Sequence, residues 1–292
     1  MLKNSILLLY IALVWASAIL FVKIEESTIP PITIMAGRAL IAFLTLFVVA
    51  LITQKKMLSV MSYLPKFLFL AVLGIVLTWV GLAFGQEYLT VGLASVLVTV
   101  TPLVTFVILV FILRMESFSL IGLGGLLMGI VGLILVIGLQ NILAGGSTLL
   151  GVFYIGGAFV LLAINGILIM KWLRSIDPII TTMYLLLFGG VILAVLAFIF
   201  ESPVQVPWTK DTIAAELALS IICTASGYFG YFYMIRNAGA YFSSFIFYFL
   251  PIFGNLEGHF FRGEVINISQ IIGIVIVILG IYLINRQKFK KG

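Results

Sequence analysis

Long apolar runs separated by short polar linkers dominate the pattern of this chain. Each run is close to the length of about 20 residues that an α-helix needs to cross the hydrocarbon layer of a membrane. The runs predict ten membrane-spanning helices at residues 5–24, 32–53, 66–86, 92–113, 120–139, 149–170, 179–200, 212–235, 241–261 and 268–285. The linkers between them carry Pro, Gly and charged residues and are too short to hold a soluble domain. We therefore expect an all-α, polytopic membrane protein.

The first apolar run also has features of a signal peptide. Lys3 precedes it, and Ala16-Ser17-Ala18 imitates a cleavage site. The run continues through Val22, however, and the bulky Trp15 stands where a small residue is expected. We interpret the run as the first membrane helix.

Composition narrows the class of protein. The chain is 63% hydrophobic and 9% charged, whereas soluble domains contain about 25% charged residues. One Cys and one His are too few for a disulfide or a zinc cluster, and the chain lacks a GxxxxGK[ST] phosphate loop. No Asp lies in a predicted span. We expect no enzyme activity, no metal and no cofactor.

The net charge of +6 has its meaning in the distribution of basic residues among the linkers. If the N-terminus is cytoplasmic, twelve Lys and Arg fall on the inner side and three on the outer side, with Arg38 inside the second span. This bias predicts that both termini are cytoplasmic, in the plasma membrane or the bacterial inner membrane. The basic residues are explained by topology and indicate no nucleic-acid partner.

The two halves of the chain repeat one pattern. Glu116 is followed by glycines 9 and 16 positions later, and Glu264 is followed by glycines at the same offsets. Upstream, Pro102 lies 14 positions before Glu116, and Pro251 lies 13 positions before Glu264. The spacing predicts two five-helix repeats.

An odd number of helices in each repeat has a consequence for topology. The second repeat must enter the membrane from the opposite side, which gives an inverted repeat. Such repeats support alternating access in secondary transporters, with the substrate site near the middle of the membrane. We expect the repeats at residues 1–140 and 147–286, followed by a basic tail at 287–292.

Several segments resemble the EamA-type branch of the drug/metabolite transporter superfamily. The matching residues are Trp15 with Ser17, Pro31 to Arg38, Ala39 and Ala42, Ala94 to Pro102, Phe249 to Gly254, Glu116, and Gly263-Glu264. The resemblance covers essentially the whole chain. It implies a ten-helix transporter of a small metabolite and favours efflux over uptake. The sequence departs from the family pattern at Ala16 and at Ile164-Asn165-Gly166.

Arg38 and Glu257 are ionisable residues within predicted spans, where charge is costly and usually functional. Arg38 either extends to the interface as a structural residue or faces the cavity and binds a carboxylate or phosphate group. Glu257 lies at a similar depth, so an ion pair between the two is a further alternative. His259 is about 200° from Glu257 around the helix, and we favour Glu257 as the substrate-binding and proton- or cation-coupling residue.

Other candidate substrate-binding residues carry rings or polar groups inside the spans. Aromatic rings can hold a planar group or a cation, and an amide can donate a hydrogen bond, although both also serve helix packing. The candidates are Trp15, Trp79, Asn165, Tyr228, Tyr231 and Tyr248.

Three further features have structural interpretations. Glu216 is expected near an outer helix end, solvated in the first turn. Glu116 and Glu264 precede the last helix of each repeat and are expected to cap helices. The Gly125/Gly129 pair has the small-xxx-small spacing of close helix contacts. It predicts tight bundling, with a homodimer formed through the fifth helix as a further option.

These features together predict a secondary active transporter of a small polar or zwitterionic metabolite, such as an amino acid, with proton coupling as an option. The expected partners are this substrate and the lipid bilayer. One alternative is a carrier of organic cations, in which Arg38 is structural. Another is a flippase for lipid-linked intermediates, with apolar Phe side chains at a lateral entry.

Overall fold

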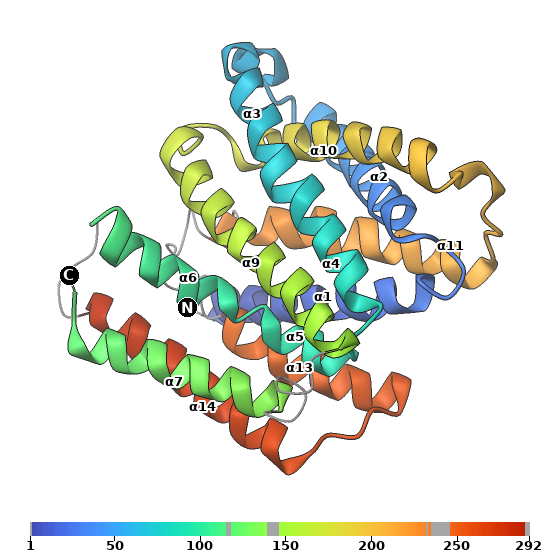
Figure 1. The fold of residues 1–292 in the computed structure, drawn as a ribbon. Coiled ribbons are helices and arrows are strands. Elements are labelled where there is room, and N and C mark those ends of the chain that lie inside the picture. Colours follow the sequence, from blue (N-terminus) through green and yellow to red (C-terminus); the bar gives the residue numbers. More distant parts are fainter. Residues whose placement is uncertain (1, 115–117, 139–145, 232, 235–245, 290–292) are drawn as a thin grey trace.

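A computed structural model of the chain describes residues 2–114, 118–138, 146–231, 233–234 and 246–289, and these residues form an all-helical bundle (Figure 1). The first repeat contains α1 (Leu2–Glu25), α2 (Pro31–Ile52), η1 (Met57–Tyr63), α3 (Leu64–Ala71), η2 (Val72–Leu77), α4 (Thr78–Gln86), α5 (Val91–Leu97), α6 (Val100–Val107), η3 (Ile108–Ile112) and α7 (Leu120–Ile137). The second contains α9 (Ser147–Trp172), α10 (Pro178–Phe200), η4 (Pro203–Gln205), α11 (Lys210–Leu217), η5 (Ala218–Ser226), α13 (Ile246–Arg262) and α14 (Ile268–Phe289).

Among the described residues, eight helices are long and apolar enough to cross a membrane. They are Ile6–Glu25, Pro31–Ile52, Val60–Gln86, Val91–Ile112, Leu120–Ile137, Ser147–Trp172, Pro178–Phe200 and Lys210–Tyr231. These are the first eight predicted spans, shifted by a few residues at their ends. The ninth predicted span begins outside the described residues and continues as α13, and the tenth corresponds to α14. The all-helical, ten-span prediction is confirmed.

The fifth and tenth spans, α7 and α14, lie side by side at one edge of the bundle (Figure 1). Their glycines meet backbone to backbone. A Cβ atom added to Gly132 would lie 2.7 Å from the carbonyl oxygen of Gly273, and one added to Gly273 would lie 2.8 Å from that of Gly132. Gly132 lies 16 positions after Glu116 and Gly273 lies 9 positions after Glu264, so glycines of both repeated offsets build the contact between the halves.

The same contact changes the interpretation of the glycines in the fifth span. A Cβ added to Gly280 would lie 2.6 Å from the oxygen of Gly125 and 2.7 Å from the nitrogen of Gly129. The Gly125/Gly129 pair therefore packs against α14 of the same chain. These two glycines are therefore not available as a surface for self-association. A homodimer stays a prediction, and it would have to form through another surface.

The second helices of the two repeats, α2 and α10, also pack against each other. Each begins with a proline at a position where a helix needs no backbone donor. At one end, the Glu201 carboxylate accepts hydrogen bonds from the backbone nitrogens of Ile32 (2.9 Å) and Thr33 (2.7 Å). At the other end, Lys55 pairs with Asp177 at 2.7 Å. Residues of the two repeats thus fasten this helix pair at both ends.

The third and eighth spans share a π-helical segment, η2 in the first repeat and η5 in the second. In each, a threonine hydroxyl donates to the carbonyl five residues earlier: Thr78 to Leu73 at 3.0 Å, and Thr224 to Leu219 at 2.8 Å. A π-helical turn inserts one residue and redirects the side chains around it, and such turns are frequent at functional sites. Thr224 becomes part of the site described below.

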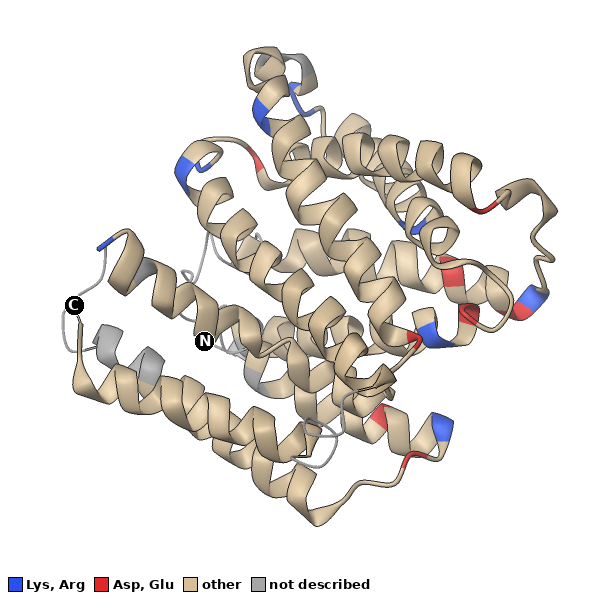
Figure 2. Ribbon diagram, viewed as in Figure 1, with Lys and Arg blue, Asp and Glu red and all other residues tan. Residues whose placement is uncertain are grey.

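The carboxylate of Glu264 caps a helix. It accepts hydrogen bonds from the backbone nitrogens of Val91 (2.7 Å) and Gly92 (3.0 Å) at the start of α5. The helix that Glu264 caps is therefore α5 of the first repeat, and not α14, which follows Glu264 in the chain. Glu116 lies outside the described residues. Figure 2 shows most Lys, Arg, Asp and Glu at the helix ends and in the linkers, as a membrane bundle requires.

Candidate substrate site

Arg38 on α2 is the basic residue at the centre of the site, and only 7% of its surface is exposed. Its Nε atom donates a hydrogen bond to the Thr224 hydroxyl on η5 at 2.8 Å. Its guanidinium carbon lies 4.1 Å from the centroid of the Trp79 ring, a distance typical of a cation–π contact. Within the described residues, no carboxylate forms an ion pair with Arg38.

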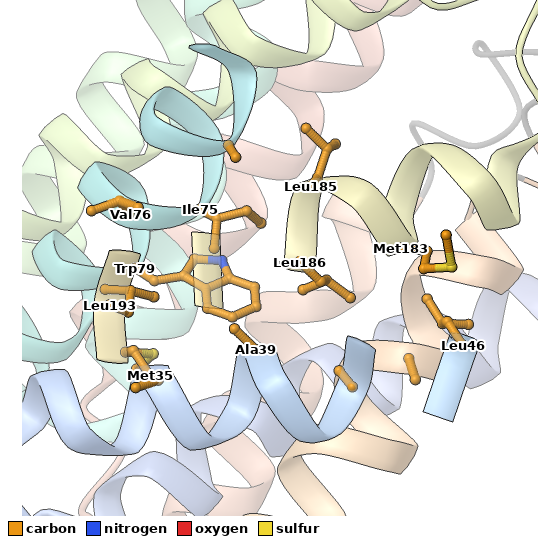
Figure 3. Packing of buried hydrophobic residues seen from close by; sticks show 14 of the residues in the cluster. Met35, Ala39, Leu46, Ile75, Val76, Trp79, Met183, Leu185, Leu186 and Leu193 are labelled. Carbon is orange, nitrogen blue, oxygen red and sulfur yellow. The ribbon is translucent and has the colours of Figure 1, made fainter. Parts of the chain in front are cut away.

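Trp79 on α4 is buried in the largest apolar cluster and is 1% exposed. Figure 3 shows its indole packed among Ile75, Leu186 and Leu193, with Ala39 of α2 below it. The indole therefore supports Arg38 from a fixed position. In this conformation the ring is covered by protein on its remaining sides.

The aromatic candidates extend from Trp79 as a continuous series. The Trp79 indole lies within hydrogen-bonding reach of the Tyr228 side chain. Trp15 on α1 packs against Tyr228 with ring centroids 5.6 Å apart and against Tyr231 with centroids 5.1 Å apart. The Trp15 Nε1 atom is buried and has no hydrogen-bond partner among the residues that the structure describes, and it would lie 2.6 Å from a Cβ added to Gly227. Arg38 and four predicted aromatic residues thus form one connected group.

Two carboxyl groups that the sequence did not single out for function lie beside Arg38. Glu25 ends α1 and is 0% exposed, and Glu216 on α11 is 3% exposed. Their side chains lie within hydrogen-bonding reach of each other, and both are close enough to Arg38 to feel its charge. The Glu216 Oε1 atom would lie 2.5 Å from a Cβ added to Gly37, so a glycine next to Arg38 makes room for it.

The expectation that Glu216 is solvated was wrong. Thr209 forms a capping box that starts α11 at Lys210, which places Glu216 beyond the first turn. At that position it faces α2 and receives a 3.3 Å hydrogen bond from the Ser220 hydroxyl. Glu25 ends an apolar run, and the sequence pattern does not distinguish it from an ordinary interfacial acid.

Glu257 on α13 lies apart from Arg38 in the hydrogen-bond pattern. The Ser17 hydroxyl on α1 donates to its Oε1 atom at 2.7 Å, and its Oε2 atom is buried without a hydrogen-bond partner. The described residues show no ion pair between Glu257 and Arg38, so that alternative is not seen. His259 is exposed, and its Nδ1 atom lies 2.9 Å from the Glu264 carbonyl oxygen.

Asn165 is not part of the Arg38 group. Asn165 on α9 is 4% exposed and fills the space over Gly74 of η2, where its Nδ2 atom would lie 1.9 Å from an added Cβ. Its Oδ1 atom is buried, and no described residue forms a hydrogen bond with it. The Tyr248 side chain lies outside the described part of the structure.

One cavity of about 280 Å³ lies at the ends of α4, α5, α7, α9 and α14. Its lining is Tyr88, Leu89, Thr90, Leu93, Leu135, Val136, Ile137, Gly138, Thr148, Asn267, Ser269 and Gln270. None of the predicted site residues whose side chains the structure describes lines it. This cavity is therefore separate from the Arg38 group.

Comparison with known proteins places the chain among transporters. An "Uncharacterized transporter YoaV" of Bacillus subtilis (strain 168) is 25% identical over 284 residues, which cover 97% of each chain. An "Uncharacterized transporter" of Archaeoglobus fulgidus is 24% identical over 98% of this chain and 100% of its own length. A "WAT1-related protein At3g02690, chloroplastic" of Arabidopsis thaliana is 29% identical over 70% of this chain and 50% of its own.

A solved crystal structure has the same fold, with a TM-score of 0.72, 13% sequence identity and coverage of 96% of both chains. The family model described as "EamA-like transporter family" matches this chain twice, at residues 2–138 and 149–286. The two matches are the duplicated halves that meet at α7 and α14. The chain is a multi-pass membrane protein and belongs to the EamA-like transporter family.

Proposed function

We propose that this transporter carries a small polar or zwitterionic metabolite, such as an amino acid, by alternating access. The two repeats would rock against each other and open the central region alternately to each side of the membrane. The bias in basic residues supports a plasma- or inner-membrane location with both termini in the cytoplasm. The family resemblance favours efflux as the direction.

The observation that carries this proposal is the state of Arg38. A buried guanidinium is normally paired with a carboxylate, yet Arg38 has a hydroxyl and an aromatic face as its nearest partners. An anionic group on the substrate would supply the direct bidentate contact that these partners do not provide. Arg38 is therefore assigned to the substrate's carboxylate.

The other candidates take roles that follow from their chemistry. Glu257 keeps one buried oxygen without a partner and would accept an amine or a coupling proton. The rings of Trp15, Tyr228 and Tyr231 would contact the body of the substrate. Asn165 on α9 and Tyr248 on α13 remain candidate contacts to the substrate.

The experiment is a thermal-shift measurement with matched ligands on the purified full-length protein. Each amino acid is paired with the amine that remains when its carboxylate is removed, and betaine is paired with choline. A ligand at 100 times its Kd stabilises a protein by about 2.7 kcal/mol. We expect at least one acid to stabilise the wild type, its amine partner to have no effect, and Arg38→Gln to abolish the shift. The proposal fails if no acid gives a carboxylate-dependent shift.

The second candidate function is an organic-cation carrier, and the aromatic group favours it. Three rings, those of Trp15, Tyr228 and Tyr231, lie together, as in sites that bind quaternary amines. Under this alternative Arg38 is structural. Choline or an amine would then stabilise the protein more than its acid partner does, and the shift would persist in Arg38→Gln.

A further inference from the structure

The buried pair Glu25 and Glu216 has a hydrogen-bonding arrangement that two ionised carboxylates cannot satisfy. The two side chains lie within hydrogen-bonding reach of each other. Both oxygens of Glu25 and the Oε2 atom of Glu216 are buried and receive no hydrogen bond from a donor in the described part of the protein. Ionised carboxylates only accept hydrogen bonds, whereas a protonated carboxyl also donates one. A single proton on the pair gives each residue a partner.

The charges around Glu25 and Glu216 also indicate that the two residues hold one proton. Two ionised carboxylates beside one guanidinium would leave a net negative charge in a buried site, and two adjacent carboxylates do not both ionise readily. With one proton, the remaining carboxylate balances Arg38, which is close to both acids. The group is then neutral.

The charged groups on the neighbouring helices α1, α4 and α13 have other partners or lie in solvent. Lys23 pairs with Glu26 at 3.2 Å, and Glu87 is exposed. Glu257 accepts its hydrogen bond from Ser17 at 2.7 Å. Among these groups, none replaces Arg38 as the counter-charge of the pair.

The side chains of η5 and of the helical turn after it that lie near the pair or Arg38 are neutral. Ser220 donates to Glu216 at 3.3 Å, and Cys223 and Tyr228 lie near Arg38. These groups supply polarity without compensating a second negative charge. The protonation of the pair therefore depends on Arg38.

We propose that Glu25 and Glu216 together hold one proton, and that this proton site is coupled through Arg38 to the binding of the substrate's anionic group. An anion on Arg38 replaces the carboxylate of the pair as the counter-charge. The released carboxylate then takes up a second proton from water, so the charge of the group stays balanced. This coupling rests on the proposed function, whereas the shared proton does not.

The coupling determines how transport depends on protons. Because binding free energies are reciprocal, an anion that draws a proton onto the pair also binds more tightly when the pair is protonated. Substrate and proton then move together. An inward proton gradient would drive uptake by this route, in contrast to the efflux that the family resemblance favours.

Infrared spectroscopy of the full-length protein in lipid nanodiscs at neutral pH tests the proposal without a substrate. The signal is the C=O stretching band of a protonated carboxylic acid. Every protein in this experiment also carries Glu26→Gln, because Glu26 has a pKa of about 7 and is itself partly protonated at neutral pH. We expect the band to be larger in the protein that keeps both Glu25 and Glu216 than in Glu25→Gln or Glu216→Gln, because the one remaining carboxylate of the pair stays ionised beside Arg38. Arg38→Gln should increase the contribution of the pair to the band to about twice its size, since both carboxyls then hold protons. Glu87→Gln, which changes an exposed acid, is the matched control and should leave the band unchanged.

The opposite results overturn the proposal. A band that is as large in both Glu25→Gln and Glu216→Gln as in the protein that keeps both acids excludes the shared proton. A band that does not grow in Arg38→Gln excludes the coupling to Arg38. Each single variant keeps one carboxylate as the counter-charge of Arg38, so both are expected to fold and to elute from a size-exclusion column at the volume of wild type. If both fail to do so, the assignment of one proton and one negative charge to the pair is wrong. Failure here leaves the ligand test of the proposed function intact, and the converse holds as well.

Discussion

Arg38 and Thr224 join the two repeats by a hydrogen bond of 2.8 Å between the guanidinium Nε and the threonine hydroxyl. The threonine hydroxyl also donates to the Leu219 carbonyl within the π-helical segment η5. Its lone pair therefore points to Arg38 because its proton is used by the backbone. This relationship fixes the guanidinium at the junction of α2, α4 and η5.

Replacing Thr224 with Val removes this acceptor at nearly constant volume. Hydrogen bonds to charged groups contribute about 1.5–3 kcal/mol, so Thr224→Val should lower the free energy of unfolding by this amount, measured by thermal unfolding in detergent. Thr45→Val on α2 is the control, because the Thr45 hydroxyl donates only to the Ile41 carbonyl of its own helix. Equal losses in the two variants would contradict the assigned contact.

Glu201 stabilises α2 from the opposite repeat, since its carboxylate accepts from the backbone nitrogens of Ile32 and Thr33 and from the Thr33 hydroxyl at 2.9 Å. Loss of a helix cap costs about 0.5–2 kcal/mol. We expect Glu201→Ala to lower the unfolding free energy toward the upper end of this range. Glu87→Ala, at an exposed acid, should change it little; a similar loss in both variants would disprove the capping role.

The glycine contact between α7 and α14 leaves no room for a methyl group. In Gly280→Ala the new Cβ would lie 2.6 Å from the Gly125 oxygen, and such overpacking costs about 1–3 kcal/mol. In Gly124→Ala the new Cβ has no heavy atom within 4 Å, so this variant should gain about 0.5–1 kcal/mol from helix propensity. Thermal unfolding distinguishes the two. If Gly280→Ala is as stable as Gly124→Ala, the helices do not approach this closely.

Glu26, in the turn after the first span, gives the stability a dependence on pH. Burial raises the pKa of Glu26 from 4.5 to about 7, although Lys23 opposes the shift. Because the folded state binds the proton more tightly than the unfolded state, this carboxyl contributes stability at low pH that is lost as pH rises from 4.5 to about 7. The difference in melting temperature between wild type and Glu26→Gln should therefore change across this window. A difference that is constant with pH would show that Glu26 does not titrate there.

Much of the fold follows from the sequence because the membrane imposes simple requirements. A span needs about 20 apolar residues, so the runs predict the helices, and the repeated glycine offsets predict the halves that meet at Gly132 and Gly273. The sequence also names the aromatic candidates Trp15, Tyr228 and Tyr231, whose rings pack together in the structure. These features depend on position along a single helix or on a repeated pattern.

The features that were missed depend on distances between helices. Arg38 and Glu257 have similar depths, but depth does not give the separation across a bundle, and the structure shows no ion pair between them. The burial of Glu216 depends on the start of α11 and on Gly37 in the facing helix. Neither its partner Glu25 nor this packing is visible in a single sequence.

Substrate counterflow in proteoliposomes tests the central claim, that Arg38 binds the anionic group of a transported metabolite. Vesicles are loaded with the acid that gives the largest carboxylate-dependent thermal shift, and uptake of a labelled trace from outside is followed in wild type and in Arg38→Gln. We predict transient accumulation in wild type, none for the matched amine and none in Arg38→Gln. Accumulation that is equal in wild type and Arg38→Gln, or that favours the amine, would contradict the claim.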